Sequence, residues 1–161
     1  MIQAPGFTNS GATNEVAANA SANAAFGNHA SVQGPMRVGV FATASSSRSS
    51  AGASFYGIME LSGNLWEQVV TFGNSDGRNF TPVHGNGALT SAGHADVSAW
   101  PGYVTSANTG AAGSGRRGGS WEDVAERMRT SDRFQANGAV STRNRANGFR
   151  AVRSLPSTSA Q

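Results

Sequence analysis

Two glutamates, Glu60 and Glu67, are the residues whose spacing first suggests chemistry, because they flank the short run "LSGNLW". Two carboxylates on opposite sides of a bound substrate are what general acid and base catalysis requires. The same two residues could instead cap a turn or hold a metal ion. We favour the capping or metal-holding role, because no other catalytic group accompanies the pair.

Other catalytic chemistry has little support in the sequence. The chain has no cysteine, which excludes a disulfide, a thiolate metal site and a cysteine nucleophile. His29, His84 and His94 lie apart in polar segments without the spacing of metal ligands, so we expect them to be exposed. The glycine-rich run "GAAGSGRRGGS" lacks the Lys-Ser/Thr of a phosphate loop. The sequence therefore predicts that this protein is not an enzyme.

All 12 basic residues are arginine, and most of them follow Arg116. A basic C-terminal third is one mark of a nucleic-acid-binding protein. Here, however, acids are interleaved with the arginines and no nucleic-acid-binding motif is present. Arginine's planar fork suits hydrogen bonds to carbonyls and carboxylates as well as to phosphate. We therefore expect structural arginines and no nucleic-acid partner.

The elements that must position these residues are expected to be short. The 161 residues suffice for about one domain. Leu, Ile, Val and Phe together contribute only 26 residues, but the net charge of +3 is too low for a disordered chain. The sequence therefore predicts a loop-rich α+β domain with a small core.

The chain divides by composition into segments of different character. "MRVGVF" has strand-like β-branched residues, and residues 15–26 have a weak helical signal among residues that favour turns. The expected division is an irregular segment at 1–31, a domain at 32–153 that includes a long loop at 73–115, and a tail at 154–161.

Membrane insertion is not expected. No run of about 18 apolar residues occurs, and the start "MIQAPGFTNSG" lacks the basic and apolar regions of a signal peptide.

Four blocks carry a resemblance to a known family. They are "GPMRVGVFATA", "SFYGIMELSGNLWEQVV", "GRRGGSWEDVAERMRTSDRF" and "NGFRAVR". In this order they resemble the C-terminal part of the formylglycine-generating-enzyme (sulfatase-modifying factor) family over roughly residues 34–153. The resemblance implies a loop-rich variant of the C-type lectin fold. It also implies structural roles, with Phe149 pointing inward, for Gly63, Asn64, Trp66, Gly118, Gly119, Trp121, Arg133, Phe149 and Arg150.

The enzymatic members of the family differ from this chain where their chemistry takes place. The oxidases bind copper through a pair of cysteines, and this chain has none. The related sulfoxide synthases draw iron ligands from a separate helical domain, and no such histidine cluster is present. The N-terminal Arg-Leu-Pro-Thr-Glu-x-Glu-Trp-Glu block is also missing. We therefore expect neither copper nor iron.

The resemblance also implies a structural calcium ion at the Gly-Asn-x-Trp-Glu turn. Carried over, its ligands would be the carbonyls of Gly63 and Leu65 and the side chain of Glu67. Oxygen-only ligation is what calcium requires. The alternative is that Glu67 merely bonds to neighbouring backbone N–H groups.

The segment after "RGGSW" is the expected ligand face. The chain resembles the variable proteins of diversity-generating retroelements, which display exposed residues between Arg-Gly-Gly-Ser-Trp and Gly-Phe-Arg. We expect "EDVAERMRTSDRF" to form a loop and strand pair, held by Arg127 or Arg129, Arg133 and Arg150. The corresponding exposed residues are Glu122, Asp123, Val124, Ala125, Glu126, Met128, Phe134, Gln135, Asn137, Arg143, Asn144 and Asn147.

The preferred function is therefore a non-enzymatic domain that binds a protein or glycan on another surface. We expect it to be extracellular, on a cell surface or on a virion, with homo-oligomers or larger assemblies as further partners. One alternative is a structural or tip subunit of a phage tail, injection system or surface filament. A second alternative is a degenerate remnant of an oxidase.

Overall fold

Short elements joined by ordered loops make up the fold. The computed structural model describes residues 1–4, 6–28, 34–81, 88–92, 94, 97–101, 103, 112–142 and 144–149. Over these residues the protein contains both strands and helical turns but is mostly loop and turn, which confirms the predicted α+β, loop-rich class.

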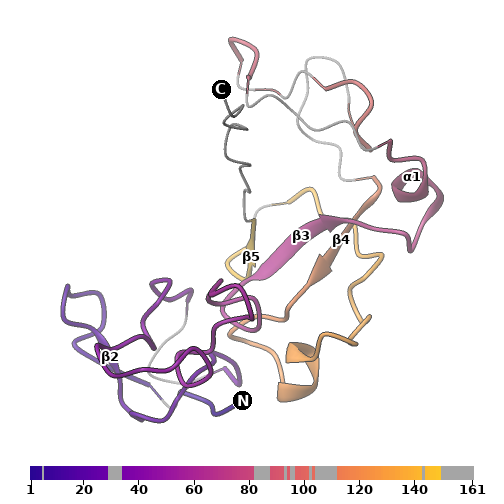
Figure 1. The fold of residues 1–161 in the computed structure, drawn as a ribbon. Coiled ribbons are helices and arrows are strands. Elements are labelled where there is room, and N and C mark those ends of the chain that lie inside the picture. Colours follow the sequence, from indigo (N-terminus) through magenta and orange to yellow (C-terminus); the bar gives the residue numbers. More distant parts are fainter. Residues whose placement is uncertain are drawn as a thin grey trace, which may run out of the picture.

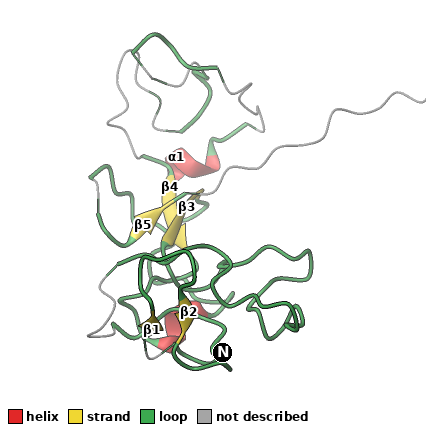
Figure 2. Ribbon diagram, turned by 90° about the vertical axis from the view of Figure 1, so that its left-hand side faces the viewer, coloured by secondary structure: helices red, strands yellow, loops and turns green. Residues whose placement is uncertain are grey.

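A three-stranded sheet lies between the N-terminal loops and the part of the chain that carries α1 (Figures 1 and 2). Its middle strand, β3 (Trp66–Val70), pairs antiparallel with β4 (Ser114–Arg117) and parallel with β5 (Asn147–Gly148). The register places Glu67 opposite both Arg117 and Gly148. The sheet therefore brings three distant parts of the sequence together.

Close backbone contacts hold a loop against β4. A Cβ on Gly115 would collide with the carbonyl of Ala136, so only glycine fits there. The Arg116 N–H donates to the Gln135 carbonyl at 2.8 Å. The hydroxyl of the buried Thr71, just after β3, donates to the same Ala136 carbonyl. The segment after Asp132 is thus fixed to the sheet.

The N-terminal segment packs into a core with residues that follow it. β1 (Phe7–Thr8) pairs with β2 (Val16–Ala17), and the weak helical signal of residues 15–26 does not produce a helix. The buried cluster joins this segment to a turn that follows it, and its members are Ala4, Ala22, Ala25, Val40 and Phe41. Small alanines allow the backbones to approach closely.

The run "MRVGVF" forms a turn and not the strand that its composition suggested. Gly39 has a φ of 81°, which is incompatible with an extended strand. Its N–H donates to Oε1 of the buried Glu60 at 3.2 Å. This turn directs Val40 and Phe41 into the core.

The Gly63–Asn64 turn connects three segments. Both residues have the positive φ expected of this pair, 84° and 64°. Asn64 Oδ1 accepts from the Met36 N–H at 2.8 Å, and its Nδ2 donates to the Met36 carbonyl at 3.1 Å. The Asn64 backbone bonds to Ala25 and Trp121. We call this residue the Asn64 junction.

In the described part of the expected long loop lies a short helix, α1 (Ser75–Arg78), which was not predicted. Asn74 caps it by accepting from the Gly77 N–H at 2.9 Å. Gly77 lies so close to the Thr71 and Gly113 carbonyls that a side chain would not fit.

Within the described ranges, no helix has the length and apolar character needed to cross a membrane.

Candidate functional site

The expected ligand face starts from a tightly fixed turn. Gly118 and Gly119 have φ angles of 92° and 71°, and their missing side chains make room for the Leu61 carbonyl and the Met128 side chain. Trp121 is buried, and its carbonyl accepts from Asn28 at 2.8 Å. The "RGGSW" block thus anchors the beginning of the expected ligand face.

Asp123 fixes the next turn. Its Oδ2 accepts from the Ser120 N–H at 2.9 Å and also from the Ser120 hydroxyl. Its carbonyl accepts from Gly27 at 2.8 Å. Asp123 was predicted to be a ligand residue, and the structure gives its carboxylate an intramolecular role.

A 3₁₀ turn, η1 (Ala125–Met128), replaces the expected loop and strand pair. It also corrects the prediction that Met128 is exposed, because Met128 is 2% exposed and packs with Ala24 and Phe26. Its long flexible side chain enters the space that Gly119 leaves open.

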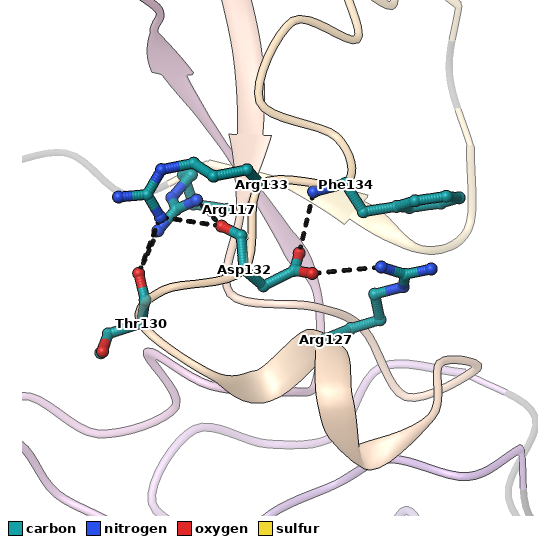
Figure 3. Close-up of polar contacts among 6 residues, drawn as sticks. All are labelled: Arg117, Arg127, Thr130, Asp132, Arg133 and Phe134. Carbon is teal, nitrogen blue, oxygen red and sulfur yellow. Dashed lines mark hydrogen bonds and ion pairs between the residues drawn. The ribbon is translucent and has the colours of Figure 1, made fainter.

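Asp132 organises the segment after η1 (Figure 3). Its Oδ1 lies 3.1 Å from Arg127 Nη1, and its Oδ2 accepts from the Phe134 N–H at 3.3 Å. Arg133 Nη1 donates to the Thr130 and Asp132 carbonyls, each at 2.9 Å. Arg117 donates to the same two carbonyls, a role that its position in "GRRGG" did not reveal.

Arg116 forms hydrogen bonds to the side chains of two of the expected ligand residues. Its Nη1 donates to Asn147 Oδ1 at 2.9 Å, and its Nη2 donates to Gln135 Oε1 at 2.7 Å. Its guanidinium lies over the Trp66 ring at 5.8 Å. Gln135 and Asn147 therefore tie their segments to β4.

Four residues next to this frame are exposed, and we call them together the η1 face: Val124, Ala125, Glu126 and Phe134. Val124 and Phe134 are each 59% exposed, although both are large and apolar. The Arg127 guanidinium lies 3.5 Å from the centre of the Phe134 ring and connects this ring to η1 (Figure 3). Stacking of this kind restricts both side chains.

Three other expected ligand residues are partly or fully exposed. Glu122 is half-buried and forms a 2.9 Å ion pair with Arg145, whose guanidinium lies 5.1 Å from the Trp121 ring centre. Asn137 is exposed. Asn144 is also exposed, and its Oδ1 accepts from the Ala146 N–H at 2.7 Å.

Phe149 differs from its predicted inward position, since it is 86% exposed. β5 is only two residues long, and Phe149 follows directly after its end. His94 is half-buried and not exposed as expected. Four other residues with predicted roles lie outside the described ranges: His29, His84, Arg143 and Arg150.

The implied calcium ligands lie partly together. A pocket of about 120 Å³ is lined by Leu65, Glu67 and Glu60, together with Asn64 and Phe149, whereas Gly63 does not line it. The described residues contain no cluster of three or more acidic or histidine side chains. Two carboxylates and backbone carbonyls are nevertheless the oxygen donors that a calcium ion accepts. The donor chemistry thus fits the ion, with Glu60 as a further donor.

A larger pocket, of about 410 Å³, lies beside α1. Its lining includes Trp100, Tyr103 and Pro101 together with Asp76 and Asn79. Trp100 and Tyr103 come from the expected long loop at 73–115.

Comparison of the chain with protein-family models, with curated proteins and with solved structures gave no match.

Proposed function

We propose that this protein is a non-enzymatic binding domain of C-type lectin-like fold, which presents the η1 face to a protein or glycan on another surface. The proposal rests on one observation above all. Phe134 is a large exposed aromatic side chain whose ring lies against the Arg127 guanidinium and whose backbone N–H donates to Asp132. The order of the four sequence blocks supports the proposed fold.

The physical argument concerns the cost of ordering a surface on binding. Aromatic and arginine side chains supply most of the binding energy in protein interfaces, and binding is stronger when they are already ordered. Phe134 and Arg127 supply both types in contact. The neighbouring backbone is fixed as well, because the Arg116 N–H donates to the Gln135 carbonyl and the Ser120 N–H donates to Asp123 Oδ2. The η1 face therefore combines an exposed anchor with a fixed frame.

The pocket beside Glu67 belongs to the same proposal as a structural calcium site. Glu60 and Glu67 would hold the ion together with the Leu65 carbonyl. The ion would stabilise the start of β3 and contribute no reaction chemistry.

The test is a binding screen with the wild-type domain on a glycan array and on a panel of cell-surface proteins. Phe134→Ala is expected to weaken each interaction found by about 30-fold, the loss typical of a central interface residue.

Phe55→Ala is the matched control, because Phe55 is likewise exposed and lies 5.0 Å from a guanidinium, that of Arg48. It should leave binding unchanged. Full binding by the Phe134 variant, or equal losses in both variants, would count against the η1 face.

A further inference from the structure

Two guanidinium groups lie together between β4 and the loop after η1. Arg117 and Arg133 both donate to the carbonyls of Thr130 and Asp132 (Figure 3). Two guanidinium groups that bond to the same carbonyls are close enough to repel one another, and a neutral carbonyl cannot cancel a positive charge. The shared carbonyls therefore position the two arginines without neutralising them.

The nearby carboxylate offsets only part of this charge. Asp132 is paired at 3.1 Å with a third arginine, Arg127, and also accepts from the Phe134 N–H. Burial first, and repulsion from Arg133 second, lower the pKa of Arg117, despite the opposing attraction of Asp132. Three arginines and one carboxylate leave an excess of positive charge.

Arg133 also retains unused donors. It is exposed, and of its guanidinium nitrogens only Nη1 bonds to a described residue. Its Nε and Nη2 can therefore donate to a ligand. A guanidinium presents its N–H groups in a planar fork that matches two oxygens of a tetrahedral anion.

We propose that Arg117 and Arg133 form a binding site for a tetrahedral oxyanion, the group shared by sulfate esters and phosphate monoesters. Arg133 supplies the open N–H donors, while the half-buried Arg117 adds charge and fixes the position of the pair. The site does not depend on whether the η1 face binds a ligand.

The test is a titration of the full chain with sodium sulfate and, separately, with sodium phosphate, at ionic strength held constant with chloride. Binding is followed by NMR of the arginine Nε–H groups and by calorimetry. We expect saturable shifts of the Arg117 and Arg133 signals. Signals that move linearly with salt, together across all arginines, would overturn the proposal.

A matched pair of variants separates a specific site from general attraction by a basic protein. Arg133→Gln should weaken anion binding by about tenfold or more, the loss expected for charge-assisted hydrogen bonds. Arg48→Gln removes the same charge from another exposed arginine that bonds to a backbone carbonyl, and it should change the affinity less than about twofold. Equal effects of the two variants would contradict the site.

Two further comparisons define the chemistry. Arg133→Lys keeps the charge but loses the planar fork, so it should also weaken binding several-fold. Phosphate gains a second negative charge near neutral pH whereas sulfate does not, so only phosphate affinity should rise with pH. Tighter binding of sulfate than of phosphate at every pH would assign the site to sulfate esters. Tighter binding of phosphate, with an affinity that rises with pH, would assign it to phosphate groups. Full binding by Arg133→Lys would refute recognition by the fork.

Discussion

At the scale of single residues, the Asn64 side chain forms hydrogen bonds that a neighbouring backbone would otherwise form. It pairs with both the N–H and the carbonyl of Met36, as an adjacent strand would, while it is only 4% exposed. Its φ of 64° is tolerated better by asparagine than by most other residues. Two separate properties, the amide and the backbone angle, thus select asparagine here.

Replacement of Asn64 should therefore cost stability in two separable parts. Asn64→Ala removes the partner of two half-buried backbone groups of Met36 and adds strain at a positive φ, for a total of about 2–4 kcal/mol. Asn64→Gly removes the same hydrogen bonds but relieves the strain, so its loss should be about 1 kcal/mol smaller. Urea unfolding of the three proteins measures both parts. Equal losses would show that the angle does not matter.

Some residue roles could be read from the sequence and others could not. The glycines and Asn64 were recognisable because special backbone angles demand particular residue types. Met128 and Phe149 were assigned to the wrong environment, since an apolar side chain can face either way in a segment without periodicity. Arg116 and Arg117 were missed because their partners are carbonyls and amides, which leave no signature in the sequence.

At the scale of elements, most of the strands and helical turns are too short to predict. β1, β2 and β5 contain two residues each, and η1 makes one turn, so neither the strand nor the helix period can repeat. β3 is the longest strand among the described residues and lies at the end of the block "SFYGIMELSGNLWEQVV". Its start also contributes Glu67 to the proposed calcium site.

Calcium should stabilise the contact between the start of β3 and the segment that carries Glu60. At a calcium concentration of 100 times the dissociation constant, the free energy of unfolding should rise by about 2.7 kcal/mol. Calorimetric melting with CaCl₂, compared with MgCl₂ at equal ionic strength, measures this gain. In Glu67→Gln the calcium-dependent part should disappear, whatever the variant's stability without the ion. A melting temperature that calcium leaves unchanged in the wild type would exclude the site.

At the scale of the whole molecule, the described parts depend on one another. The expected boundary between residues 31 and 32 separates Ala4, Ala22 and Ala25 from Val40 and Phe41, which pack together in one cluster. The Ala25 carbonyl also accepts from the Asn64 N–H at 2.9 Å. Composition distinguished the N-terminal segment, but contacts between small alanines gave no sequence signal that it contributes to the core.

Deletion of residues 1–31 should therefore abolish cooperative unfolding. The remaining chain would expose Val40 and Phe41 and lose the partner of the Asn64 N–H. We expect circular dichroism and calorimetry of residues 32–161 to show no sharp thermal transition. A sharp transition close to that of the full chain would show that residues 32–153 fold independently.

The Asn64 junction has a consequence for the order of events during synthesis. Its backbone partners include Ala25, which the ribosome makes earlier, and Trp121, which it makes much later. β3 likewise gains its neighbours only when Arg117 and Gly148 have emerged. Contacts so distant in sequence form slowly, and they cannot form at all while one partner is missing. Trp66 and the start of β3 must therefore remain without their final neighbours, and accessible to chaperones, until Gly148 has been made.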